Sequence, residues 1–171
     1  SEVTFKQEMV AEGSSMYLGI GEKVHLSDLA VGMMMSSGND AANAAALSIS
    51  DSFEDFSKRM NERAEQIGMK NTHFVTPSGL DDDNHYSTAF DMALLMSYAL
   101  ENEDFANFTS KKSAKVDFAE PDKHITYSNH NRLLSLYEYC TGGKTGYTQA
   151  AGRCLVTSAK KDGLTFVCVT M

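Results

Sequence analysis

The sequence predicts a mixed α/β fold of the α+β type, in which a cluster of helices packs on an antiparallel sheet. Apolar residues recur at helical spacing between residues 27 and 108, whereas residues 153–160 and 164–171 have the texture of strands. Asp162-Gly163 separates these two strands and is typical of a tight hairpin turn. Helices therefore come first and strands last, unlike the alternating order of a parallel βαβ fold.

Bulk composition limits the possible functions. The chain has 171 residues, of which 42% are apolar and 22% are charged, so one folded domain, or most of one, is expected. There are 15 basic and 23 acidic residues, which gives a net charge of −8. This acidic balance argues against a nucleic-acid partner, because such a partner requires a basic surface.

The first two helices are expected on either side of a break. Ser27 is the expected N-cap of the first helix, and Met33 and Met34 belong to its apolar stripe. Ser36-Ser37-Gly38-Asn39 interrupts this helix. The alanine-rich residues 40–49 then resume it.

Three further helices follow. Ser52 is expected to cap a helix that ends at Gly68. Thr88 with Asp91 resembles the capping box of another helix, and a short helix is expected around residues 105–108. From residue 116 onward, short strands replace helices.

The three cysteines, Cys140, Cys154 and Cys168, are expected to be free thiols. A two-residue hairpin turn places Thr157 opposite Cys168, so Cys154 and Cys168 would point to opposite faces of the sheet. The cysteines show no metal-ligand spacing. We therefore expect no disulfide, no metal and no cofactor.

Gly142-Gly143-Lys144-Thr145-Gly146 is the most unusual stretch in the chain. At the start of a strand, an ammonium and a hydroxyl can hold an anion, while Gly146 allows a ligand to approach the backbone. An ordinary turn that leads into a strand explains the same residues, and that interpretation is favoured for the stretch on its own.

Ser37-Gly38-Asn39 lies at the break between two helices, where a hydroxyl and an amide can project into a cleft. Alone, this triplet is more simply explained as the cap of the next helix. However, an S-x-N triplet between helices, followed about a hundred residues later by K-T-G on a strand, resembles the second and third motifs of the penicillin-interacting serine enzymes.

Several other segments, in the same order, look like the serine-type D-alanyl-D-alanine carboxypeptidases, the low-molecular-mass penicillin-binding proteins. They are residues 12–18, 37–42, 60–64, 68–74, 78–81, 85–89 and 143–148. The resemblance implies a penicillin-binding, transpeptidase-like fold and a cell-wall hydrolase. Such an enzyme removes the terminal D-alanine from peptidoglycan stem peptides through an acyl-enzyme, is inhibited by β-lactam antibiotics, and works in the cell envelope outside the cytoplasm.

The resemblance also implies roles for individual residues. Ser37 would relay a proton to the leaving amine, and Asn39 would hold the substrate amide. Lys144-Thr145 would bind the terminal carboxylate beside Gly146, and the backbone N–H of Tyr147 would complete an oxyanion hole.

The sequence departs from the family in two respects, the nucleophile motif and the last strand and helix. The S-x-x-K motif, which carries the nucleophile and its lysine, is expected to precede residue 1. Ser158-Ala159-Lys160-Lys161 fits the letters, but it is expected on a strand, whereas the motif needs one helical turn. Residues 1–171 are therefore expected to be an internal part of a carboxypeptidase domain, without its last strand and helix. Such a part is expected to be inactive alone and to self-associate, with any membrane anchor outside it.

Two alternative functions are a class A β-lactamase and a non-catalytic binding module. A class A β-lactamase needs a glutamate in an E-x-x-L-N context, which does not occur. A non-catalytic module that binds peptidoglycan or β-lactams would fit the missing nucleophile.

Several other polar residues are weaker candidates for a functional site. Asp81–His85 lacks the glycine and distal glutamate of a calcium loop, so a solvated turn is expected. His73 is expected to be structural. A substrate contact from His130 or Arg132 stays open.

Overall fold

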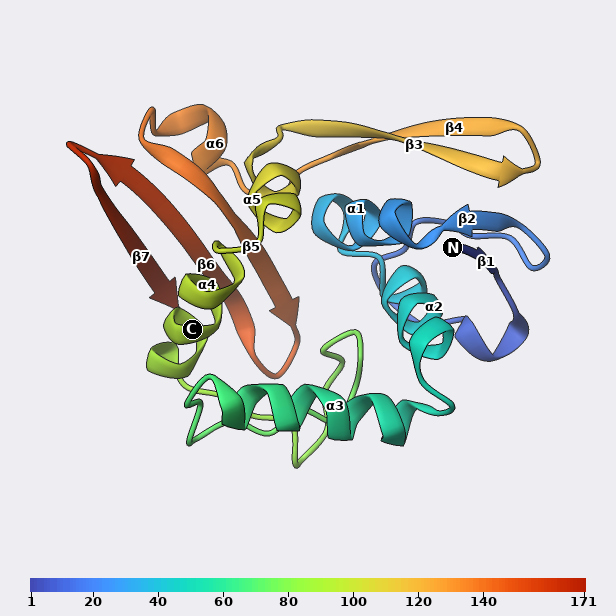
Figure 1. Cartoon of the computed structure of the whole chain (residues 1–171), viewed down its shortest axis with the longest axis horizontal. Coiled ribbons are helices and arrows are strands. Elements are labelled where there is room, and N and C mark those ends of the chain that lie inside the picture. Colours follow the sequence, from blue (N-terminus) through green and yellow to red (C-terminus); the bar gives the residue numbers. More distant parts are fainter.

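The computed structural model describes all 171 residues and contains two antiparallel sheets with helices around them (Figure 1). The strand order is β1-β2-β3-β4 in the first sheet and β5-β6-β7 in the second. The predicted α+β class is confirmed, but the helices are shared between two sheets. The strands are β1 (Glu2–Thr4), β2 (Lys23–His25), β3 (Ser113–Glu120), β4 (Lys123–Ser128), β5 (Cys140–Thr148), β6 (Gly152–Lys161) and β7 (Leu164–Thr170).

The helices divide between these sheets. The α1 helix packs on the first sheet, α4 packs on β6 and β7, and α5 lies between α1 and β5. The α2 helix packs on α1, while α3 runs along one end of the molecule (Figure 1). The helices are η1 (Gln7–Met9, 3-10), α1 (Leu26–Ser36), α2 (Asn39–Ile49), α3 (Phe53–Gln66), α4 (Ala89–Ala99), α5 (Glu103–Ser110) and α6 (Leu133–Leu136).

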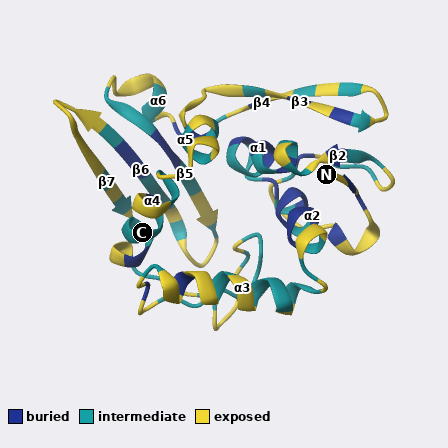
Figure 2. Ribbon diagram, viewed as in Figure 1, coloured by how far each residue is buried: buried dark blue, intermediate teal, exposed yellow.

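The hydrophobic core lies between the first sheet and helices α1 and α2, where buried residues gather (Figure 2). It forms because α1 and β3 each turn an apolar face inward. Its fourteen buried members are Val3, Phe5, Met9, Met16, Val24, Leu29, Val31, Met35, Ala41, Ala44, Ala45, Val116, Phe118 and Tyr127.

The start of α1 differs from the prediction. The helix begins at Leu26, directly after β2, and its N-cap His25 makes no side-chain cap bond. Ser27 therefore lies inside the first turn and is exposed. The chain passes from strand to helix without a capping side chain, and this is why the propensity of serine for the cap position misled the prediction.

The predicted caps of α3 and α4 are found. Ser52 Oγ accepts a hydrogen bond from Asp55 N at 3.1 Å, and Thr88 Oγ1 accepts one from Asp91 N at 3.1 Å. The Asp91 carboxylate does not complete a capping box with Thr88. It turns instead to the segment after α3, where it accepts hydrogen bonds from Asn71 N and Thr72 Oγ1, each at 2.7 Å.

The C-terminal hairpin has the predicted register. Asp162 and Gly163 have φ values of 51° and 79°, as a two-residue type I′ turn requires. Thr157 lies opposite Cys168, as predicted. All three cysteines are free thiols.

Candidate active site

Ser37 lies at a sharp break between α1 and α2. Its backbone is left-handed, with φ 56° and ψ 35°, and α2 starts two residues later. Gly38 is required at this break, because a Cβ there would lie 2.9 Å from Met16 Cγ and 3.0 Å from Met16 N. The sequence therefore forces the chain to turn here, and the turn leaves the serine side chain free of the helix.

Two glycines bring β5 close to its neighbours. A Cβ on Gly143 would lie 2.4 Å from Val156 O of β6, and one on Gly142 would lie 2.5 Å from Thr109 Oγ1 of α5. Any side chain at either position would push β5 away. The glycines thus set the position of the next residue, Lys144.

Lys144 meets Ser37 across 107 residues of sequence. Lys144 Nζ donates to Ser37 Oγ at 2.5 Å and to the Thr145 carbonyl oxygen at 2.6 Å. Burial lowers the pKa of this lysine to about 8. No carboxylate forms an ion pair with it, so the ammonium is available to an incoming anion.

Ser37 and Lys144 line a cleft of about 1010 Å³ between α1, α2 and the second sheet. Met33 and Met34 are half-buried and line this cleft; of the methionine triplet, only Met35 lies in the core. Other residues that line the cleft are Ser14, Asn39, Asp81, His130, Thr145, Gly146, Tyr147, Arg153 and Leu155.

Asn39 is held by the segment before α1. Its backbone N–H donates to Ser14 O at 2.8 Å, and its side-chain Nδ2 donates to Glu12 O at 2.6 Å. The side-chain oxygen makes no hydrogen bond within the protein. Asn39 therefore presents a free acceptor at the cleft and keeps one amide hydrogen for a ligand.

Asp40 organises the loop that faces Asn39, a role that the sequence did not reveal. This buried carboxylate accepts hydrogen bonds from Ser15 Oγ at 2.7 Å, Met16 N at 2.9 Å and Leu18 N at 3.1 Å. Its position directly after the S-x-N triplet, within an alanine-rich buried helix, was the available signal, because a buried carboxylate needs donors.

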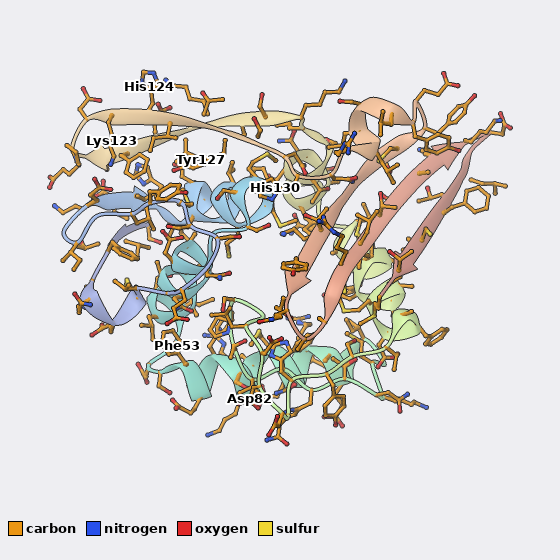
Figure 3. The ribbon with its side chains drawn as sticks, turned by 180° about the vertical axis from the view of Figure 1, so that it is seen from behind. Phe53, Asp82, Lys123, His124, Tyr127 and His130 are labelled. Atoms are coloured by element: carbon orange, nitrogen blue, oxygen red, sulfur yellow. The ribbon has the colours of Figure 1, made fainter.

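Tyr127 of β4 supports the same loop from the other side (Figure 3). Its hydroxyl donates to Met16 O at 2.7 Å. Burial, with a contribution from Asp40, raises the pKa of Tyr127 to about 12, so the phenol stays protonated and keeps donating.

The remaining predicted site residues differ in whether they line the cleft. Thr145, Gly146 and Tyr147 all line the cleft, as does His130 in the segment after β4 (Figure 3). Arg132 is exposed and does not line it. Of the two residues, only His130 is thus placed to contact a ligand in the cleft, and a substrate contact from it stays a prediction.

In the polar segment around residue 81, the side chains of Asp81 and Asp82 accept hydrogen bonds from groups of the protein itself. Asp81 Oδ1 accepts from Thr148 Oγ1 at 2.7 Å, and Asp82 Oδ1 accepts from Asn84 N at 2.8 Å. His73 is structural, as predicted: its Nδ1 lies 2.7 Å from Asn84 O. Nowhere in the structure do three or more His, Cys, Asp or Glu side chains gather as metal ligands would.

The S-x-x-K string at residue 158 lies on β6, as predicted. Ser158 is buried and its Oγ shares a hydrogen bond with Thr141 Oγ1 at 2.8 Å. Residues three apart on a strand point to opposite faces, so Lys161 cannot activate Ser158. Separately, no helix combines the length and apolar composition needed to cross a bilayer.

The D-alanyl-D-alanine carboxypeptidase family matches residues 1–171. The chain is 40% identical over 157 residues to D-alanyl-D-alanine carboxypeptidase DacF of Bacillus subtilis, covering 92% of this chain and 40% of that protein. It is 36% identical over 169 residues to DacD of Escherichia coli, covering 97% of this chain and 42% of that protein.

Solved structures agree with the sequence matches. A Streptomyces DD-transpeptidase superimposes with a TM-score of 0.93 at 29% identity, over 99% of this chain and 71% of that one. The carboxypeptidase DacD of Francisella tularensis gives 0.90 at 31% identity, over 99% and 53%. The chain spans about two fifths of the length of the curated relatives it matches. With its S-x-N and K-T-G residues meeting in one cleft, the chain belongs to the D-alanyl-D-alanine carboxypeptidase family.

Proposed function

We propose that the protein is a serine-type D-Ala-D-Ala carboxypeptidase, which removes the terminal D-alanine from peptidoglycan stem peptides and is acylated by β-lactams. The observation that carries the proposal is the hydrogen bond from Lys144 Nζ to Ser37 Oγ. It joins a cation and a hydroxyl, from distant parts of the chain, in a cleft that is open to a peptide.

The substrate peptide binds along β5. This strand is at the edge of its sheet, so its outer side can pair with an extended peptide, which would join the sheet as an extra strand. Lys144 and Thr145 then receive the terminal carboxylate, and Asn39 meets a backbone amide of the substrate. A carboxylate suits this place because Lys144 has no acidic partner of its own.

The reaction needs a serine from a segment outside residues 1–171. Its oxygen attacks the carbonyl of the penultimate D-alanine while its proton passes to the lysine of the same S-x-x-K motif, and the backbone N–H of Tyr147 helps to stabilise the resulting oxyanion. Collapse of this intermediate breaks the C–N bond and leaves an ester on the serine. The departing amine takes its proton through Ser37 Oγ, whose hydrogen bond to Lys144 keeps it oriented. Water then hydrolyses the ester.

The substrate places the protein on the outer side of the cytoplasmic membrane, held there by segments outside this chain. Residues 1–171 alone are proposed to self-associate, because large apolar side chains of the last hairpin, such as Leu164 and Phe166, are 61% and 57% exposed. Fractionation of the full-length protein into the cytosol would contradict the location. A monodisperse monomer of residues 1–171 in analytical ultracentrifugation would contradict the self-association.

The test is release of D-alanine from a D-Ala-D-Ala peptide by the full-length protein and by Lys144→Ala. Loss of the cation should lower kcat/KM by on the order of a hundredfold or more. Lys160→Ala, which removes an exposed lysine of β6 outside the cleft, is the control and should leave turnover intact. If Lys144→Ala turned over the peptide as fast as the wild-type protein, the role assigned to Lys144 in binding the carboxylate would be refuted. Peptide binding without any release would favour the non-catalytic module instead.

A further inference from the structure

Arg153 is a second cation in the cleft, and the proposed reaction does not use it. It lies on β6, directly opposite Tyr147 of β5. Its guanidinium carbon is 5.8 Å from the centre of the Tyr147 ring, and it forms no ion pair. Its head group is therefore held over an aromatic ring while its N–H donors remain free.

The pairing of the strands places Arg153 relative to Thr145. Thr145 and Tyr147 are two residues apart on β5, so they point to the same face of the sheet. Their partners on β6, Leu155 and Arg153, share that face. All four line the cleft. Arg153 therefore lies about 7 Å farther along the cleft floor than Thr145, at roughly 3.3–3.4 Å per residue.

This spacing identifies the residue of a substrate that would contact Arg153. The identification rests on the proposed function. If the terminal carboxylate binds at Lys144 and Thr145, an extended peptide places its third-last residue about 7 Å from its last one. The third-last residue is the one before D-Ala-D-Ala. Its side chain falls beside Tyr147 and within reach of the Arg153 guanidinium.

The charges around Arg153 favour an acidic group on the bound peptide. The only carboxylate lining the cleft is that of Asp81, which already accepts a hydrogen bond from Thr148 Oγ1 at 2.7 Å. The chain as a whole carries a net charge of −8, which repels anions. An unpaired arginine against an aromatic ring is a local exception and matches a carboxylate by its paired N–H donors.

We propose that Arg153 is a specificity-determining residue, which binds a carboxylate on the side chain of the residue that precedes D-Ala-D-Ala. The preferred substrates are thus stem peptides whose third-last residue carries a free side-chain carboxylate, rather than an amide or an amine.

The test uses two N-acetylated tripeptides that end in D-Ala-D-Ala and begin with L-glutamate or L-glutamine. These side chains have nearly the same shape and differ in charge. The full-length protein should show a kcat/KM ratio of about 1.5-fold to fivefold in favour of glutamate, the range for an ion pair of an exposed arginine. Added salt should reduce this ratio.

Substitutions test whether the preference for glutamate over glutamine is due to Arg153. In Arg153→Gln the ratio should fall to about one, while Arg153→Lys should retain part of it because the charge remains. Arg132→Gln removes an exposed arginine outside the cleft and should leave the ratio unchanged. A wild-type ratio of one, or an unchanged ratio in Arg153→Gln, would overturn the proposal.

A binding measurement separates this proposal from the function on which it rests. Fluorescently labelled versions of both peptides are titrated with the same proteins, and Kd is obtained from fluorescence polarisation. If neither peptide is hydrolysed but glutamate binds more tightly only when Arg153 is present, the carboxypeptidase assignment fails and the carboxylate site stands. Equal Kd values for both peptides in the wild-type protein would refute the site.

Discussion

The two halves of the cleft are built differently. The core half, formed by the first sheet with η1, α1 and α2, contains every member of the fourteen-residue buried cluster except Phe5 and Met16, which lie in the connecting segments between these elements. The hairpin half, formed by β5, β6 and β7, buries only Gly142, Gly143, Thr157 and Ser158, and β7 has no buried residue (Figure 2). Ser37 and Asn39 thus rest on a packed core, whereas Lys144 depends on close backbone contacts of β5.

This difference predicts unequal stability effects for apolar truncations. Leu29→Ala in the core half should lower the free energy of unfolding by about 2–5 kcal/mol, because Leu29 is 1% exposed. Phe166→Ala in the hairpin half should change it by less than about 0.5 kcal/mol, because Phe166 is 57% exposed. Urea unfolding of both variants of residues 1–171, to which these exposed fractions apply, measures both. Losses of equal size would show that the hairpin half carries a core as well.

The backbone contacts of β5 predict a second contrast, between two glycines of the same strand. Gly143→Ala should destabilise the protein by about 1–3 kcal/mol, since its Cβ would lie 2.4 Å from Val156 O, a backbone atom that cannot swing away. Gly146→Ala meets its nearest neighbour, Cys154 Cβ, at 3.7 Å and should cost less than about 0.5 kcal/mol. Thermal unfolding compares the two variants. A tolerated Gly143→Ala would contradict the account of how Lys144 is placed.

The buried lysine predicts a pH dependence. Burial lowers the pKa of Lys144 to about 8 from an ordinary value of 10.5. Above pH 8 the folded protein loses this cation, so kcat/KM for a peptide with a free carboxylate should fall about tenfold per pH unit. A peptide ending in a C-terminal amide is the control and should show no such decline. A flat profile for the free carboxylate would separate Lys144 from substrate binding.

The lowered pKa of Lys144 also makes the free energy of unfolding depend on pH, in a direction that proton binding determines. Below pH 8 both the folded and the unfolded chain hold the proton on Lys144. Between about 8 and 10.5 the unfolded chain still holds it, whereas the folded chain has released it. The unfolded state then binds more protons, so the contribution of Lys144 makes the protein more stable as pH rises through this window. Activity and stability should therefore move in opposite directions.

Short-range signals in the sequence predicted much of this. The Asp162-Gly163 turn correctly predicted the hairpin register, in which Thr157 lies opposite Cys168. The break at Ser37-Gly38 correctly predicted where the first helix ends and the second begins. The motif residues Ser37 and Lys144 were found because their types and spacing resemble a family, and the structure brings them together.

Contacts between residues far apart in the sequence could not be predicted from such short-range signals. The strands β1 and β2 have three residues each, too few to show alternation, so the first sheet was not predicted. The partners of Asp40, at positions 15, 16 and 18, are more than twenty residues away and include two backbone N–H groups, which leave no trace in side-chain patterns. The cleft position of Arg153 likewise follows from strand pairing and not from a motif.

The central claim is that residues 1–171 provide the substrate-binding walls of the cleft, while the nucleophile comes from elsewhere in the protein. The most direct measurement is covalent labelling with a fluorescent penicillin, applied to residues 1–171 alone and to the full-length protein. We expect stable labelling of the full-length protein and none of residues 1–171, because Ser37 has no lysine one helical turn away to activate it. Stoichiometric acylation of residues 1–171 would contradict the account and would place the nucleophile at a serine within this chain, with Ser37 or Ser158 as the first to be mapped.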